Sequence, residues 1–390
     1  MKFVLAGYGS RGDVEPCVAV GRELLRRGHD VHLAVPPDRR RFVESAGLVA
    51  VAYGPDTGEQ IHEATEFARR VQDPMSALPQ LAERVTQMWV EKSGVLAALA
   101  EGADLLGAGM NEQRLAVNVA ESHGMPFAAL HFFPARALEL GVAQAHVTSV
   151  AEGAQRLALG LPQGGPSPMG PVLEIQAYEE FCLPERAAEW AGSEYRRPFV
   201  GSLTLEMPTD ADDEVLSWIA DGPPPIYFGF GSTPITSPPE TIAVISAACE
   251  QLGERALICS GPNDFTRLTL SGHTKIVDAV NHQAVLPACR AIVHHGGAGT
   301  TAAGMRAGVP MLVLWLWLDQ PIWAAAVSKL GVGIARSFSE STYDSLVADL
   351  RALLAGDYLA AAREVAARMT KPAESVAKAA DLLEEAARSG

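Results

Sequence analysis

The chain has 390 residues, enough for two or three domains, and 48% of them are apolar while 20% are charged. This balance is typical of a globular protein with a sizeable core. The formal net charge of −15 argues against binding to nucleic acid or to an anionic membrane surface through bulk charge.

The five cysteines are scattered, odd in number and without a C-x-x-C pair. We interpret them as reduced core residues and expect a cytoplasmic protein, either a monomer or a weak dimer. Gly7, Gly9, Arg11 and Asp13 interrupt the first apolar run too early for a signal peptide. The longest apolar run, 311–318, is too short to span a bilayer, so we expect at most a peripheral contact with a membrane.

Along the chain, short apolar runs alternate with helical patterns. The runs are continuously apolar, which indicates parallel strands that are covered by helices on both faces. In the first half we expect strands in KFVLAGY, DVHLAVP, LVAVAYG, ADLLGAG, PFAALHFF, VLEIQAYEEF and RRPFVGSL. In the second half we expect them in PIYFGFGS, RALICSG, TKIVDAV, AIVHHGG, PMLVLWLW and VGIARSF.

This pattern predicts two Rossmann-like, doubly wound α/β domains in residues 1–205 and 225–370. An acidic and then proline-rich stretch, 206–224, is the expected linker, and 371–390 is expected to be a helix that returns to the first domain. Ligands of such sheets bind at the carboxyl ends of the strands, so we expect a cleft where the two domains face each other.

The stretch GYGSRGDVEP follows the first apolar run, and its glycines match the G-x-G-x-x-G pattern of a dinucleotide-binding turn. A nicotinamide site also needs an acid at the end of the second strand. That strand ends in HLAVPP, which has valine and prolines there. The sequence therefore argues against a nicotinamide or flavin, and we expect no cofactor. For Asp13, at the start of the following helix, the local sequence favours an N-cap role.

A stronger signal lies in IVHHGGAGTTAAG, which follows an apolar strand of the second half and begins a helix near Gly299. Its glycines free the backbone, Thr300 and Thr301 offer hydroxyls, and His295 can donate to a phosphate oxygen. No lysine follows the glycines, so the stretch is not a P-loop. We interpret it as a diphosphate cradle that uses backbone amides in place of a metal ion.

Polar residues also end the neighbouring strands. Ser232 follows PIYFGFG, and Asp319 and Gln320 follow PMLVLWLWL, where an acid beside an amide suits a polyhydroxylated ligand. The tryptophans 315, 317 and 323 around that pair are interpreted as packing residues rather than as a sugar platform. The D-x-D at Asp210–Asp212 is interpreted as an acidic first helical turn and not as a metal site.

In the first half, His131 precedes Phe132 and Phe133 at the end of a predicted strand. These three residues either line an acceptor pocket or, in the case of His131, form part of the core. The sequence leaves both possibilities open.

The motifs G-F-G-S, V-N-H-Q, H-H-G-G-A-G-T-T and D-Q-P, each at the end of its strand, together resemble the family 1 glycosyltransferases of GT-B architecture. The resemblance covers nearly the whole chain and is greatest to actinobacterial enzymes, namely the vancomycin group and the mycobacterial glycopeptidolipid glycosyltransferases. In the broader family, the histidine of G-H-x-x-P is the catalytic base, and here Asp13 takes its place in G-D-V-E-P. The resemblance therefore implies that Asp13 is the base of an inverting displacement from a nucleoside diphosphate.

The resemblance also implies a set of donor-binding residues. For the diphosphate these are Ser10, Arg11, Ser232, His295, Ala298, Gly299 and Thr300. For the donor sugar they are Asp319 and Gln320, and for the nucleoside they are Val280, Asn281 and Gln283.

One departure bears on the donor. Many members that use UDP-sugars carry a glutamate three residues after the position of Thr300, where it binds the ribose hydroxyls, and this chain has Ala303. We therefore expect a dTDP-deoxysugar, such as dTDP-rhamnose, rather than a UDP-sugar. The expected acceptor is a hydrophobic natural product or a glycolipid. Two other hypotheses are a nucleotide-sugar 2-epimerase of the same fold and a non-catalytic partner protein.

Overall fold

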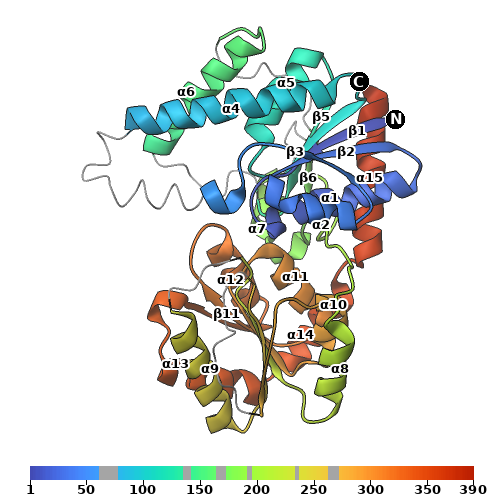
Figure 1. Cartoon of the computed structure of the whole chain (residues 1–390). Coiled ribbons are helices and arrows are strands. Elements are labelled where there is room, and N and C mark those ends of the chain that lie inside the picture. The colour runs from blue at the N-terminus through green and yellow to red at the C-terminus, as the bar shows by residue number, and fades with distance from the viewer. Residues whose placement is uncertain (61–77, 135–141, 164–172, 191–195, 233–236, 262–271) are drawn as a thin grey trace. The chain divides into compact units, whose positions relative to one another are not determined.

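The structure is a computed structural model that describes residues 1–60, 78–134, 142–163, 173–190, 196–232, 237–261 and 272–390. The chain forms two compact units, shown in Figure 1. The first unit contains residues 1–180, 184–205 and 372–390, and the second contains residues 181–183 and 206–371. The predicted linker 206–224 thus clusters with the second unit and forms a helix there.

The first unit contains a six-stranded parallel sheet in the order β3-β2-β1-β4-β5-β6. Its strands are β1 (Lys2–Ala6), β2 (Asp30–Val35), β3 (Val49–Ala52), β4 (Leu105–Ala108), β5 (Phe127–His131) and β6 (Leu173–Gln176). Its helices are α1 (Arg11–Arg26), α2 (Arg40–Ser45), α4 (Leu78–Ala100), α5 (Gln113–His123), α6 (Val142–Ala158), α7 (Pro184–Trp190) and α15 (Pro372–Ser389), with the 3₁₀ turn η1 (Pro37–Arg39).

Both faces of this sheet are buried, as the continuous apolar runs predict. Phe3 and Leu5 of β1 belong to a core that contains residues of α1, α2 and α15. Val4 and Ala6 point to the opposite face and pack with α4 and α5. Since successive side chains of a strand point to opposite faces, both sets must be apolar. The predicted strand RRPFVGSL forms only an isolated bridge between Phe199 and Gln176.

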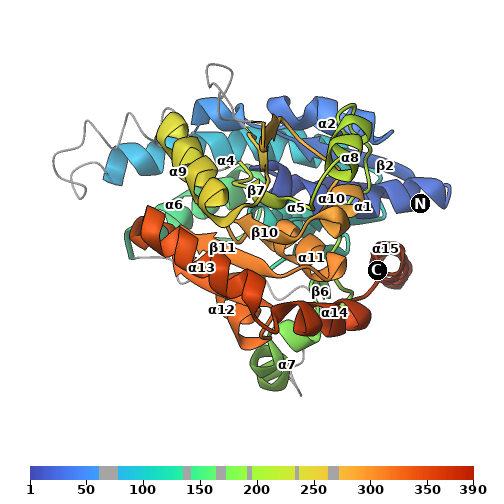
Figure 2. The ribbon, with the colours of Figure 1, turned by 90° about the horizontal axis from the view of Figure 1, so that it is seen from below.

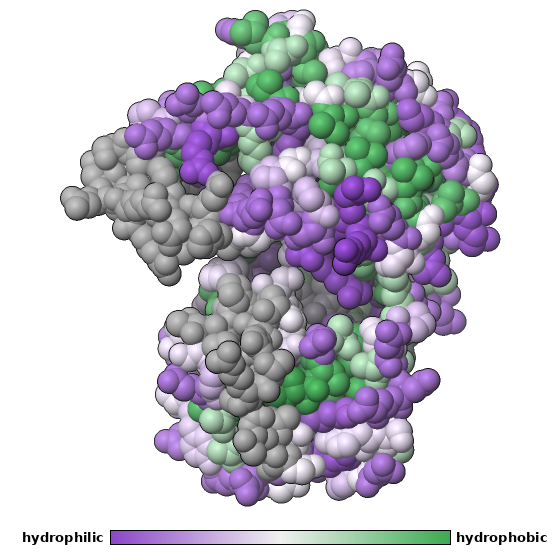
Figure 3. Space-filling model, viewed as in Figure 1, coloured by the Kyte–Doolittle hydropathy of each residue, from purple (hydrophilic) through white to green (hydrophobic). Residues whose placement is uncertain are grey.

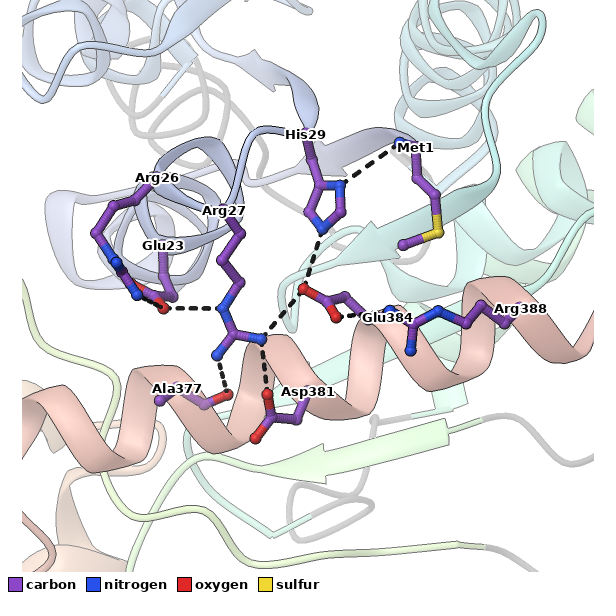
Figure 4. A network of polar contacts seen from close by, with 9 residues as sticks. All are labelled: Met1, Glu23, Arg26, Arg27, His29, Ala377, Asp381, Glu384 and Arg388. Carbon is purple, nitrogen blue, oxygen red and sulfur yellow. Dashed lines mark hydrogen bonds and ion pairs between the residues drawn. The ribbon is translucent and has the colours of Figure 1, made fainter.

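The C-terminal helix α15 packs on α1 through apolar and charged contacts. Leu382 and Leu383 lie in the core. At the edge of this core, the guanidinium of Arg27 contacts Asp381 at 2.6 Å and Glu384 at 3.1 Å, as Figure 4 shows. His29 also contacts Glu384, at 3.0 Å, and the hydrogen bonds from His29 and Arg27 lower the pKa of Glu384 to about 2. The last 19 residues thus complete the first unit.

The second unit repeats the architecture with the strand order β12-β11-β10-β7-β8-β9. Its strands are β7 (Ile226–Gly229), β8 (Ala256–Cys259), β9 (Thr274–Val277), β10 (Ala291–His294), β11 (Met311–Trp315) and β12 (Gly333–Ser337). Its helices are α8 (Asp212–Ala220), α9 (Pro238–Leu252), α10 (His282–Val285), α11 (Ala298–Ala307), α12 (Gln320–Lys329), α13 (Tyr343–Ala355) and α14 (Tyr358–Arg368). The 3₁₀ turns of this part of the chain are η2 (Glu180–Cys182), η3 (Leu286–Ala288) and η4 (Phe338–Glu340).

Helices cover both faces of the second sheet as well. Residues of α9 and α13 share one apolar core with alternate residues of β7, β8, β10 and β11. On the other face α11 packs so closely that a Cβ at Gly304 would lie 2.5 Å from the sulfur of Met311. Figure 2 shows α9 and α13 on one side of β10 and β11, and α11 on the other. On the outer surface in view in Figure 3, hydrophilic residues surround smaller hydrophobic patches on each unit.

Candidate active site

Each sheet has one point where the strand order reverses. In the first sheet it lies between β1 and β4, and in the second it lies between β7 and β10. The loops after these strands diverge to opposite faces of the sheet, so ligands of open α/β sheets bind there. Asp13 follows β1, whereas Ser232 follows β7 and His295 follows β10. The sequence-predicted residues of chemical interest therefore stand at the two reversal points.

Asp13 lies in the first turn of α1, where the structure gives its two carboxylate oxygens different surroundings. Oδ2 accepts hydrogen bonds from the backbone N–H and from the hydroxyl of Ser10, both at 2.7 Å. Oδ1 accepts one bond, from Nδ2 of Asn111 at 3.2 Å. Ser10 is the N-cap of α1, so Asp13 contributes to capping through Oδ2. Oδ1 can therefore accept a further hydrogen bond.

Burial raises the pKa of the Asp13 carboxyl above its ordinary value of 3.8, although the hydrogen bonds from Ser10 and Asn111 and the charge of Arg39 act in the opposite direction. Removal from water disfavours the charged form, and hydrogen bonds to that form favour it. A carboxylate with a raised pKa is a stronger base than an exposed aspartate.

Gly9 is the residue of the glycine pattern that this arrangement requires. Its φ is 126°, a conformation that residues with a side chain rarely adopt. A Cβ at this position would lie 2.5 Å from Oδ2 of Asp13 and 3.1 Å from Nδ2 of Asn111. The glycine thus makes room for a carboxylate of the protein itself.

Asn111 was not identified from the sequence. It follows β4, the neighbour of β1, and its amide donates to the carbonyl of Tyr8 at 2.9 Å as well as to Asp13. Its position after the strand that neighbours β1 could have identified it from the sequence as a residue close to Asp13. Behind it, Glu112 forms a buried ion pair with Lys92 at 2.7 Å and accepts a hydrogen bond from Tyr53. This buried network anchors the loop that carries Asn111.

Arg11, predicted to help bind the diphosphate, forms an ion pair with Glu15 at 3.0 Å on the same helix and lies over the ring of Phe42. It is exposed, so its contribution to a phosphate site stays a prediction.

His131 ends β5 and is buried, and neither ring nitrogen has a hydrogen-bond partner among the described residues. Burial lowers its pKa to about 4, the carboxylate of Glu174 opposes this effect, and Arg197 adds to it. The ring is therefore neutral at pH 7. Phe132 and Phe133 pack edge to face, with ring centroids 5.3 Å apart. The fold thus brings a polar ring without a partner next to two aromatic side chains.

In the second unit, the ring of His295 is enclosed by two glycines. A Cβ at Gly231 would lie 2.5 Å from Cε1 of His295, and a Cβ at Gly297 would lie 2.5 Å from Nε2. Nδ1 lies 3.4 Å from the carbonyl of Gly229. Burial lowers the pKa of His295, which the contact with Gly229 partly offsets. The ring is thus held at the reversal point in its neutral form.

Next to this ring, Gly297 is the N-cap of α11 and supplies no side-chain cap to the first turn. Ala298, Gly299 and Thr300 form that turn and are partly or fully exposed, as is Ser232 on the neighbouring strand end. By contrast, the hydroxyl of Thr301 is buried and donates to the carbonyl of Gly297 at 2.9 Å. The uncapped amides of a helix start attract anions, so this turn has the properties of a diphosphate cradle.

Asp319 is the N-cap of α12, and Gln320 is its first residue. Oε1 of Gln320 accepts the backbone N–H groups of Leu316 at 2.8 Å and Trp317 at 3.3 Å, so the side-chain NH₂ group remains to donate elsewhere. A Cβ at Gly296 would lie 3.2 Å from Cβ of Gln320. The loop before α12 therefore adjoins the cradle, as expected for a sugar that is linked to a diphosphate.

The predicted nucleoside residues lie around α10. Val280 is buried, and Oδ1 of Asn281 caps the helix by accepting the N–H of Gln283 at 3.1 Å. The backbone N–H of Asn281 donates to Asp212 at 2.8 Å, and Asp212 also accepts two bonds from Thr209. Burial raises the pKa of Asp212, but these hydrogen bonds outweigh burial and lower it. Asp212 of the D-x-D is thus a buried anchor for the α10 loop, a role that was not predicted.

Comparisons with known proteins agree with this geometry. Residues 3–142 match the glycosyltransferase family 28 N-terminal domain, and residues 264–384 match the erythromycin biosynthesis protein CIII-like C-terminal domain. An uncharacterized glycosyltransferase of Mycobacterium tuberculosis is 55% identical over 414 aligned positions that cover 100% of this chain and 99% of the relative. The chain belongs to the GT-B glycosyltransferases.

More distant relatives of this glycosyltransferase include two enzymes of Amycolatopsis orientalis. The vancomycin aglycone glucosyltransferase is 29% identical and the match covers 97% of this chain and 96% of the relative. The dTDP-epi-vancosaminyltransferase is 30% identical, with 94% and 93% covered. Among solved structures, the glycosyltransferase of kitacinnamycin has a TM-score of 0.73 at 20% identity, covering 99% of this chain and 98% of that one. The kitacinnamycin enzyme therefore shares the fold of this chain.

Within the described ranges, the glycosyltransferase has no group of three or more histidine, cysteine, aspartate or glutamate side chains placed to hold a metal ion. In the same ranges, none of its helices combines the length and the apolar character that crossing a bilayer requires.

Proposed function

We propose that this glycosyltransferase moves a deoxysugar from a dTDP-sugar to a hydroxyl of a hydrophobic natural product or a lipid-linked acceptor, with inversion and without a metal ion. The observation that carries the proposal is the Asp13 carboxylate. Ser10 and Asn111 hold it in place, its pKa is raised, and Oδ1 can accept a proton.

In the proposed reaction, Oδ1 of Asp13 accepts the proton of the acceptor hydroxyl as its oxygen attacks the anomeric carbon of the donor sugar. A bond forms between the acceptor oxygen and the anomeric carbon. The bond between that carbon and the diphosphate oxygen breaks, and the electron pair leaves with the diphosphate. One displacement of this kind inverts the configuration of the anomeric carbon.

The departing diphosphate gains negative charge, and the second unit offers groups that suit it. The first turn of α11 presents backbone N–H groups, and His295 lies beside them between Gly231 and Gly297. Donors that are already in place stabilise developing charge at little reorganisation cost. Asp319 and the NH₂ group of Gln320 are proposed to hold the sugar hydroxyls.

The choice of dTDP rests on Ala303, one turn after Thr300, which cannot accept a bond from a ribose 2′-hydroxyl. Two similar proteins support it. One is the relative named dTDP-epi-vancosaminyltransferase, and the other is the glycosyltransferase VinC, which shares the fold and was solved in complex with dTDP. His131, Phe132 and Phe133 are proposed to line the acceptor pocket. A cytoplasmic site of action completes the proposal and is supported by the five buried, free cysteines.

Thermal-shift measurements with dTDP and UDP test the donor, since a ligand that binds only the folded state raises its stability by mass action. We expect the larger rise with dTDP, and a larger rise with UDP would refute the nucleotide choice.

For the reaction, we would incubate the protein with dTDP-L-rhamnose and a set of hydrophobic acceptors, and then search by mass spectrometry for the added sugar. NMR of the product gives the anomeric configuration. Retention of configuration, or conversion of a nucleotide sugar to its epimer without an acceptor, would contradict the proposal.

A further inference from the structure

The loop between β11 and α12 exposes two large apolar side chains where the donor sugar is proposed to bind. Trp317 is 51% exposed and Leu318 is 66% exposed. Trp323 is buried, so the packing role expected for these tryptophans holds for Trp323 and not for Trp317. Both exposed residues directly precede Asp319 and Gln320. An apolar surface thus lies beside the residues proposed to bind the sugar hydroxyls.

The backbone of this loop is strained at Leu318. Its φ is 56°, and Leu318 is the only residue other than glycine with a positive φ in the part of the chain that the structure describes. A left-handed conformation is unfavourable for a leucine, and an exposed leucine gains no compensating burial. Such strain persists where surrounding contacts impose it.

Gln320 provides those contacts. Its Oε1 accepts the N–H groups of Leu316 and Trp317, and its own N–H donates to the carbonyl of Trp317 at 3.2 Å. The loop is therefore held in one shape by the same residue whose NH₂ group is available to the ligand. Gly296 packs against Gln320, which places the loop beside the start of α11.

We propose that Trp317 and Leu318 form the sugar-specificity surface of the donor site, which packs against the C6 methyl of a 6-deoxysugar. This inference rests on the proposed function. Asp319 is proposed to accept hydrogen bonds from the sugar and the NH₂ group of Gln320 to donate one. These two groups are enough for a sugar that lacks some of its hydroxyls. A C6 hydroxyl against these side chains would lose water without gaining a partner, whereas a methyl gains apolar contact.

The test uses a matched pair of donors, dTDP-6-deoxy-D-glucose and dTDP-D-glucose, which differ only in the oxygen at C6. Isothermal titration calorimetry gives the affinity of each donor and of dTDP without needing an acceptor. We expect the wild type to prefer the deoxy donor by about 10- to 100-fold, since an apolar pocket rejects one added hydroxyl by no more than about 10². Trp317→Ala should reduce that preference to about twofold and leave dTDP binding unchanged, while Trp317→Phe should retain most of it.

Leu318→Gly adds a second readout. Glycine adopts a φ of 56° without strain, so this variant should keep or raise the melting temperature while it reduces the preference for the deoxy donor. Leu359→Ala, at an exposed apolar position on α14, is the matched control and should change neither quantity.

Three results would overturn the inference. The first is an unchanged preference for the deoxy donor in Trp317→Ala. The second is a loss of dTDP affinity in that variant as large as its loss of affinity for the deoxy donor. The third is an effect of Trp317→Ala only on the KM of an acceptor. Failure of the wild type to bind dTDP would instead contradict the proposed function, so the two failures are distinguishable.

Discussion

The two sheets reverse their strand order in the same way, yet the groups at the two reversal points have opposite electrostatic character. In the first unit a carboxylate is held by Ser10 and Asn111, and burial raises its pKa. In the second unit an uncapped helix start, beside the neutral ring of His295, presents the backbone N–H groups that favour an anion. One backbone topology therefore carries a buried carboxylate in one unit and an uncapped helix start in the other, which suits the separate roles proposed for them.

Glycines produce this difference in both units. Gly9 leaves room for the carboxylate of Asp13, whereas Gly231 and Gly297 leave room for the imidazole of His295. In each case the space that a Cβ would fill is taken by a polar side chain at the reversal point of the same sheet. If the two reversal points have separate roles, substitutions in one unit should affect transfer and substitutions in the other should affect nucleotide binding.

The largest expected effect is that of Asp13→Asn. Loss of the base should slow transfer by about 10²–10⁴-fold, the usual contribution of general base catalysis. The affinity for dTDP should stay within about twofold, because the cradle lies in the other unit. Turnover of a dTDP-sugar with the acceptor from the screen, and calorimetry with dTDP, measure the two quantities. Near wild-type turnover of Asp13→Asn would show that Asp13 is not the base, and the proposed difference in role between the two units would then be wrong.

The buried histidine of the first unit predicts a pH dependence of stability. The pKa of His131 is about 4 in the folded protein and 6.5 without the fold. As the pH falls below 6.5, the unfolded chain takes up a proton that the folded chain does not, so stability falls until about pH 4. By pH 4 the loss attributable to His131 is about 3 kcal/mol, from 1.36 kcal/mol per unit of pKa.

Urea denaturation of the wild type and of His131→Leu at pH 7 and pH 4.5 measures this loss. The variant lacks the titrating ring and should lose less stability on acidification. The contribution of the buried His294 of the second unit is common to both proteins and cancels in the difference. Equal losses in the two proteins would show that His131 does not titrate in this way.

Gly297→Ala tests the cradle without straining the backbone, since φ of Gly297 is −63°. The new methyl group would lie 2.5 Å from Nε2 of His295 and should displace the ring. We expect dTDP binding to weaken by about tenfold, equivalent to about 1.4 kcal/mol. Gly272→Ala, where a Cβ meets nothing within 4 Å, is the control. Unchanged calorimetric affinity for dTDP in Gly297→Ala would argue against a role of His295 in binding.

The smallest effect is expected from Asn111→Ala. The hydrogen bond from Asn111 lowers the pKa of Asp13, so its loss should raise that pKa further. Since the ionised form is the base, the acid limb of the pH–rate profile should move to higher pH. Gln113→Ala, which removes side-chain bonds to the sulfur of Met110 and the carbonyl of Leu130 but none to Asp13, should leave the limb in place. A lower rate without a shift of the limb would indicate that Asn111 has only a structural role.

The sequence by itself determined the parallel sheets and the strand ends. Continuous apolar runs occur where both faces of a strand are buried, and the residues that follow such strands must lie at the carboxyl edge. Asp13, Ser232, His295 and Asp319 were located in this way. RRPFVGSL, also predicted to be a strand, forms only an isolated bridge, because a local pattern does not specify hydrogen-bond partners.

Only the tertiary structure decided which residues meet. Asn111 reaches Asp13 across 98 positions of the chain, and Asp212 holds Asn281 across 69. The close packing of His295 against Gly231 likewise depends on contacts between separate strand ends. Local patterns encode periodicity and burial, whereas these pairings follow from strand order and register, which bring distant residues within a few ångströms.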